Sequence, residues 1–307
     1  MVDWLQPALR LLHYGALLGL FGWTAFRVVG LRGLPSLPCN GGRAAILAAG
    51  VSAPFLSVVL MLASIAAMIG EPLAALDWPM VEAMTSGTSM GWAFLVRIGL
   101  LVTALGVLLA GRRTPALVMA AGCYAGALVT LGWSGHAAGT EGALGLFHRA
   151  NNGAHLLASG LWLGAIGWFL HLTIEAHRER SRIMVRPLLA AVHAFFPLGA
   201  ILVAVVAVTG LINAQLIFGL QNGVDVLTTS YGLLLATKVA LVVGMLALGA
   251  RNARVGRRAV QVHLAGSSEN ATALRSLRDS LATEIGFGVG VIMLVAMLGM
   301  LSPMPME

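Results

Sequence analysis

The sequence predicts an all-α polytopic membrane protein that folds as a single domain, a bundle of eight transmembrane helices over residues 1–307. Of the 307 residues, 58% are hydrophobic and only 10% are charged, whereas soluble domains are about half apolar and about a quarter charged. The net charge of +7 could also indicate a nucleic-acid partner. The basic residues, however, form short clusters between long apolar runs, which is typical of membrane topology signals and not of nucleic-acid binding.

Eight runs are long enough to cross a bilayer, which takes about 20 largely apolar residues. The first is interpreted as a retained helix and not a cleaved signal peptide, because Asp3 precedes it, its apolar stretch is too long for a signal core, and His13 lies within it. Pro303 is expected to end the last one. The runs cover residues 5–31, 44–69, 90–110, 115–134, 146–172, 187–214, 231–250 and 281–302.

The charges in the connections separate these helices and set their direction. Basic residues in short loops stay on the cytoplasmic side of the membrane. The odd-numbered connections carry Arg32 and Arg43, then Arg112 and Arg113, then Arg178 to Arg186, and finally Arg251 to Arg278. The even-numbered connections carry Glu71, Asp77, Glu82, Glu141 and Asp225, with Arg149 as their one Arg. Both termini are therefore predicted to lie outside the cytoplasm, and the seventh connection, of about thirty residues, to be cytoplasmic.

Ionisable side chains inside the apolar runs mark candidate sites, because they are costly in hydrocarbon. His13 and His155 lie at similar predicted depths, roughly 12 to 14 Å below the outer surface, and we expect them to face each other. Arg97 and Lys238 lie at a comparable depth, where they could supply a counter-charge to an anionic ligand or a carboxylate. Lys238 could instead extend outward to the interface.

The fifth run carries a stripe of nitrogen ligands. His148, His155 and Trp162 recur every seven residues, and Asn152 lies on nearly the same face. His136 closes the fourth run just before the outer loop. Because imidazole suits copper, zinc and iron, His13, His136, His148 and His155 are a candidate transition-metal constellation. The alternative is that each histidine, and the amide of Asn213, is only hydrogen-bonded between helices.

The methionines near the C-terminus favour Cu(I) as the bound metal. Thioethers are soft ligands that prefer Cu(I), and Met304 and Met306 lie in the sequence that follows the last run. We therefore expect Cu(I) more than Cu(II), with Met304 and Met306 capturing it at the outer face. The alternative for methionine is ordinary packing.

Several strings resemble the CopD (PcoD) copper-resistance membrane protein family, which includes the membrane part of YcnJ-type proteins. They are Ser134-Gly135-His136-Ala137, His155 to Gly164 with Trp162, Val208 to Ala214 with Asn213, Tyr231 to Lys238, and Leu248 to Asn252, so that the CopD-like region covers about residues 130–303. The resemblance implies an inner-membrane protein that handles copper and works with a separate periplasmic carrier similar to CopC.

Two functional hypotheses follow, from different classes. The first is a copper permease or delivery protein, which binds copper at the periplasmic face and moves it into or across the membrane. No ATP-binding motif with a glycine-rich loop is present, so that primary pumping by this chain is not expected. The second is a b-type haem protein for electron transfer or cupric reduction, with His13 and His155 as axial ligands and His148 as the alternative. A purely structural subunit is a third possibility.

Overall fold

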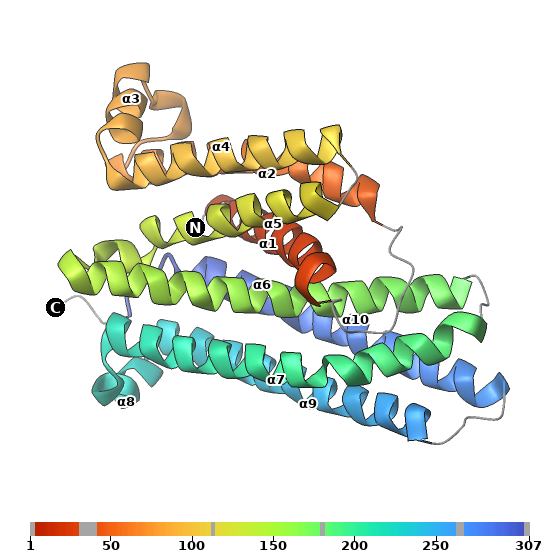
Figure 1. Ribbon diagram of the computed structural model, residues 1–307. Coiled ribbons are helices and arrows are strands. Elements are labelled where there is room, and N and C mark those ends of the chain that lie inside the picture. The colour runs from red at the N-terminus through yellow and green to blue at the C-terminus, as the bar shows by residue number, and fades with distance from the viewer. Residues whose placement is uncertain (1–3, 31–41, 112–113, 179–181, 262–266, 304–307) are drawn as a thin grey trace.

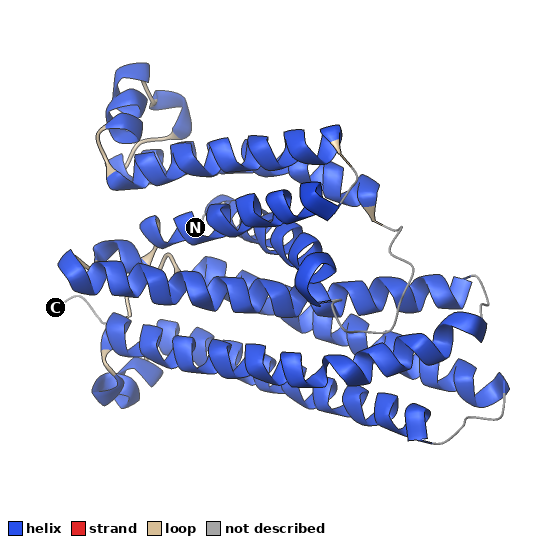
Figure 2. Ribbon diagram, in the orientation of Figure 1, coloured by secondary structure: helices blue, strands red, loops and turns tan. Residues whose placement is uncertain are grey.

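The computed structural model describes residues 4–30, 42–111, 114–178, 182–261 and 267–303, and in these ranges the only regular secondary structure is helical (Figure 2). Seven of the described helices are long and apolar enough to cross a membrane. They are α2 (Arg43–Ile69), α4 (Ser89–Ala110), α5 (Thr114–Val129) with the 3-10 turn Thr130–Trp133, α6 (Gly142–Arg178), α7 (Arg182–Phe218), α9 (Ser230–Gln261) and α10 (Ser267–Leu298). The predicted fold class, an all-α polytopic membrane protein, is confirmed.

The first helix, α1 (Leu5–Ala25), continues as a short π-helix (Phe26–Gly30) and is not among these seven. Arg10 and His13 lower its hydropathy. It nevertheless packs against α2, α5, α6 and α10, and it buries the side chains of Leu17 and Leu20. The predicted count of eight spans therefore stays a prediction that depends on α1.

The helices extend further than the apolar runs at the Arg-rich end of the bundle. The sequence predicts a connection of about thirty residues after Ala250, but α9 continues to Gln261 and α10 begins at Ser267. The physical reason is that hydropathy locates the edge of the hydrocarbon and not the end of a helix. The Ala, Leu and Arg residues of these segments are good helix formers in water.

The connections alternate between the two ends of the bundle (Figure 1). One end carries α3 (Trp78–Ser86), the 3-10 turn η4 (His136–Gly139), α8 (Gly223–Leu227), the start of α1 and the end of α10. The smaller turns η2 (Leu73–Ala75) and η5 (Leu220–Asn222) belong to the connections of α3 and α8. The opposite end carries the Arg-rich helix ends, so that the two sets of predicted connections are separated as expected.

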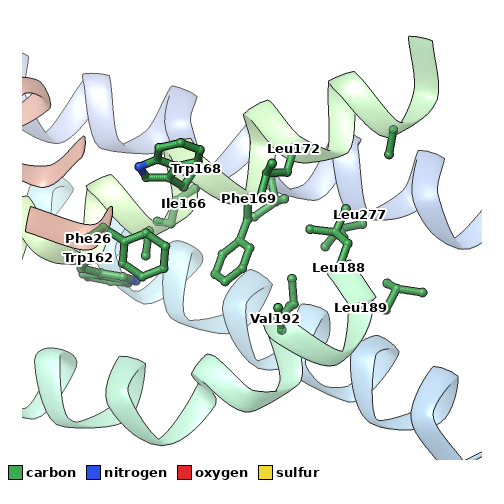
Figure 3. Close-up of a cluster of buried hydrophobic side chains, with 14 of the residues drawn as sticks. Phe26, Trp162, Ile166, Trp168, Phe169, Leu172, Leu188, Leu189, Val192 and Leu277 are labelled. Atoms are coloured by element: carbon green, nitrogen blue, oxygen red, sulfur yellow. The ribbon is translucent and has the colours of Figure 1, made fainter. Parts of the chain in front are cut away.

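Two apolar clusters hold the bundle together. One joins α6, α7, α9 and α10, and Figure 3 shows its large members, among them Trp168, Phe169 and Leu188. The other joins α1, α2, α4 and α5 around Leu17, Leu101 and the fully buried ring of Tyr124. Side chains of α6 contact both clusters, so that α6 links the two halves of the molecule.

Glycines let α1 approach α6 closely. A Cβ atom added at Gly164 would collide with the backbone of Gly22, and one added at Gly22 would collide with the Gly160 carbonyl oxygen. Small residues permit such contacts between membrane helices. Beside them the rings of Trp23 and Trp168 stack with centroids 4.3 Å apart, and Trp168 Nε1 donates a hydrogen bond of 3.0 Å to the Trp23 carbonyl oxygen. These contacts fix α1 on α6.

We expect Gly164→Val to force α1 and α6 apart and to lower the free energy of unfolding by about 1–3 kcal/mol, the usual cost of overpacking. The matched control is Gly19→Val, because a Cβ at Gly19 meets nothing within 4 Å. Thermal unfolding in detergent, followed by circular dichroism, measures the difference. Equal unfolding temperatures for the two variants would contradict the assigned contact.

Candidate metal-binding cavity

A cavity of about 240 Å³ lies between α1, α6, α7, α9, α10 and the segment that precedes η4. Its wall includes the chain around His136 and the end of α10 at Leu298, both at the end of the bundle that carries the chain termini. The polar residues among its lining are Arg10, Tyr14, His136, His148, Asn152, His155, Ser159, Asn213, Tyr231 and Lys238. Three of the four predicted histidine ligands therefore share one cavity.

The stripe on α6 arises from helical periodicity. His148, Asn152, His155 and Ser159 follow one another at intervals of three or four residues, which places them on one face. All four line the cavity. The predicted continuation to Trp162 is different, because that ring is buried in the apolar cluster of Figure 3 and is not part of the cavity wall.

The hydrogen bonds of His155 determine which of its nitrogens is free. His155 Nδ1 lies 2.9 Å from Thr209 Oγ1, and the Thr209 hydroxyl donates its one proton to the Val205 carbonyl oxygen at 2.6 Å. Thr209 Oγ1 must therefore accept from an Nδ1–H group of His155. In the neutral ring this leaves Nε2 with an unshared lone pair, the form in which imidazole binds a metal.

The two outer histidines are also held in place. His136 Nε2 lies 3.1 Å from the Leu298 carbonyl oxygen, which can only accept, so that Nδ1 is the free acceptor of the neutral ring. His148, which is 2% exposed, places Nδ1 at 2.9 Å from Thr140 Oγ1. Each ring thus uses one nitrogen for a hydrogen bond within the protein.

Asn213 lines the same cavity and is connected to α6 through Asn151. Asn151 Nδ2 donates to Asn213 Oδ1 at 2.8 Å and to the Thr209 carbonyl oxygen at 2.9 Å. These two bonds join α7 to α6 next to the hydrogen bond between Thr209 and His155. The amide of Asn213 therefore has the interhelical role that the sequence left open, and it also lies at the cavity wall.

The structure does not bring His13 to His155. The ring of His13 is fully buried and points to α2, where Nε2 lies 2.6 Å from Ser57 Oγ. Its neighbour Tyr14 lines the cavity instead. The position of a residue along a helix predicts its depth in the membrane but not the neighbouring helix that its side chain faces. A shift of one residue turns the side chain by about 100° around the helix axis. A haem held between His13 and His155 does not fit this arrangement, because only one of the two rings reaches the cavity.

The two buried cations occupy different places. Arg97 is 5% exposed and donates from Nε to Thr130 Oγ1 at 2.8 Å and from Nη2 to the Thr130 carbonyl oxygen at 3.1 Å. It lines a second, smaller cavity of about 30 Å³. Lys238 faces the main cavity. Arg97 is thus a structural link between α4 and α5, and Lys238 belongs to the site.

Sequence reasoning missed four polar residues at the site: Arg10, Tyr14, Ser159 and Tyr231. Arg10 Nη1 donates to the Gly299 carbonyl oxygen at 2.9 Å and so joins the start of α1 to the end of α10. A signal was present, because Arg10, Tyr14 and Leu18 recur at four-residue intervals on α1 and all line the cavity. Met304 and Met306 lie outside the described residues.

The lining histidines are spread along the cavity and do not form one chelate. Within the described ranges, no three His, Cys, Asp or Glu side chains lie close enough together to hold a single ion. The arrangement therefore offers successive one- or two-nitrogen positions, with His136 and His148 nearer the end of the bundle and His155 deeper. Such positions suit the transfer of an ion from one ligand to the next better than its storage at a single chelating site.

These features define the class: a polytopic helical membrane protein with a histidine-lined cavity that is shared between its two halves. A family model described as "Copper resistance protein D-like, N-terminal domain" matches residues 1–146, and one described as "Copper resistance protein D" matches residues 189–298. A curated protein named "Copper resistance protein D", from Pseudomonas syringae pv. tomato, is 34% identical over 315 residues, covering 99% of this chain and 98% of that protein. No solved structure matches.

The chain belongs to the copper resistance protein D family. The resemblance to CopD that the sequence strings indicated is thereby confirmed, and the chain is a copper-handling membrane protein. The matches add a point that the strings did not carry, because the front part of the chain also has its own family model.

Proposed function

We propose that this protein accepts copper in the histidine-lined cavity at the periplasmic end of the bundle and passes it inward from His136 and His148 to His155. The observation that carries the proposal is the free Nε2 of His155, which its bond to Thr209 orients within a cavity that also contains the other two rings. Neutral imidazoles at successive depths allow ligand exchange between neighbouring positions without full release of the ion.

Cu(I) is the proposed form of the ion. Few-coordinate sites of neutral nitrogen suit it, and the methionine tail offers soft thioether ligands. Leu298 and Gly299 line the cavity, and Pro303 follows within a few residues. Met304 and Met306 lie outside the described residues, and their proposed role in capture rests on their place in the sequence directly after Pro303.

The proposed direction of copper transfer, from the periplasm inward, rests on the separation of charged residues between the two ends of the bundle. The Arg-rich helix ends lie opposite the end that carries α3 and α8, and basic residues remain cytoplasmic. With α1 as an eighth span, both termini and the end of the cavity at His136 face the periplasm, and the protein lies in the bacterial inner membrane. A separate periplasmic copper carrier similar to CopC is the proposed donor.

We expect the double substitution His148→Ala with His155→Ala to abolish copper binding in the cavity, because it removes two of the three imidazoles. Cu(I) stoichiometry of the purified protein and copper accumulation in cells are the measurements. His177→Ala is the control, since that side chain is exposed at the opposite end of the bundle. Unchanged stoichiometry in the double variant would remove the cavity from the copper pathway.

A second substitution tests the orientation of His155 without removing it. Thr209→Val keeps the shape of the side chain but deletes the acceptor for Nδ1–H, and we expect copper affinity to fall about 10- to 100-fold, as is usual when such a support is lost. Thr103→Val is the matched control, because its hydroxyl makes the same kind of bond, to the Gly99 carbonyl oxygen at 2.7 Å, on an exposed face of α4. Equal affinities for both variants would contradict the assigned tautomer.

A further inference from the structure

The charged side chains that face the cavity are all cationic. Arg10 and Lys238 line it, and none of the carboxylates in the described part of the chain does so. Glu141 and Asp225 are exposed near the same end of the bundle. Glu284 is buried elsewhere, between α10 and α9, where it accepts a hydrogen bond of 2.5 Å from Asn252 Nδ2.

Lys238 is the single lysine of the chain, and it lies eight residues into α9, about 12 Å from the start of that helix. Tyr231, Leu235 and Lys238 form one face of α9, and all three line the cavity. His155 lines the same cavity from α6. Within the described residues its ammonium group has neither a hydrogen-bond acceptor nor an ion-pair partner.

A bare copper ion at His155 would therefore share the cavity with the Lys238 ammonium group, and no carboxylate of the described residues lines the cavity to balance the two charges. Like charges repel strongly where water is largely excluded. A bound anion reverses the sign of this interaction, because it attracts both the ammonium group and the metal ion.

We propose that the inner end of the cavity is an anion subsite, in which Lys238 binds a small monovalent anion and copper is held at His155 as the partner of that anion. This inference rests on the proposed function and names the chemical form of its substrate, a cuprous ion with an anionic co-ligand. The cavity volume of about 240 Å³ accommodates both ions. Halides and small carboxylates share the required charge and size.

The test compares Cu(I) affinity of the detergent-purified full chain in potassium chloride and in potassium gluconate at equal ionic strength. A chromophoric Cu(I) chelator, calibrated in each buffer, supplies the competition and corrects for copper–chloride complexes in solution. We expect chloride to tighten copper binding about tenfold, a coupling of about 1.4 kcal/mol. Acetate in place of chloride distinguishes a carboxylate-selective subsite from a halide-selective one.

Lys238→Met should remove the anion effect, so that copper affinity no longer differs between chloride and gluconate, because the charge that binds the anion is lost. Lys238→Arg is the matched control and should keep the effect. By reciprocity, copper should raise chloride affinity by the same factor, which the line width of the chloride NMR signal reports. The metal-free protein should broaden that signal in a Lys238-dependent way.

The failures are distinguishable. Equal copper affinity in chloride, acetate and gluconate would overturn the anion subsite and leave the proposed function intact. Weaker copper binding by Lys238→Met in gluconate would also overturn it, because lysine would then act as a neutral ligand to the metal. Absence of copper binding in every buffer, with chloride still broadened through Lys238, would overturn the proposed function and not the subsite.

Discussion

The cost of placing a polar group among apolar helices determines how this bundle is arranged. Hydrocarbon offers no hydrogen bonds, so that a polar side chain inside the bundle must find its partner on another part of the protein. Arg97 meets Thr130, Glu284 meets Asn252, and Asn151 meets Asn213. Each of these pairs joins two helices, and together they fix the relative positions of the helices that form the cavity.

Against this background, the groups that keep a free nitrogen are informative. His155 uses Nδ1 for Thr209 and lines a cavity, and Lys238 lines the same cavity without a partner in the described chain. Free polar atoms of this kind are retained where a ligand is expected to supply the missing interaction. The same physical cost thus explains both the rigid framework and the site that it surrounds.

The cavity lies where the two halves of the molecule meet. The two matched family models cover residues 1–146 and 189–298, so that most of α6 falls between them. This helix packs in both apolar clusters, and the Gly22 and Gly164 backbones let it approach α1 closely. Side chains from both halves therefore hold the histidines of α6, Thr140 at His148 and Thr209 at His155.

The fold class and much of the cavity could be predicted from the sequence, because hydropathy and helical periodicity are local properties. The grouping of His148 with His155 follows from their seven-residue spacing. His136 could be added to them because the fourth run ends on the same side of the membrane as the fifth run begins. The direction of His13 could not be predicted, since it depends on how α1 is rotated against α2 and Ser57. Arg10 escaped notice because its partner is a carbonyl oxygen at Gly299, 289 residues away, and no pattern in the sequence marks a backbone acceptor.

The central claim is that copper binds to imidazole nitrogen within the cavity. X-ray absorption spectroscopy of the purified protein, loaded with one equivalent of Cu(I), tests this most directly, because imidazole rings give a characteristic multiple-scattering pattern. The account predicts that pattern in the wild-type protein and its loss when His148 and His155 are both replaced by alanine. A first shell of sulfur alone, without imidazole scattering, would contradict the account and would place copper on methionine.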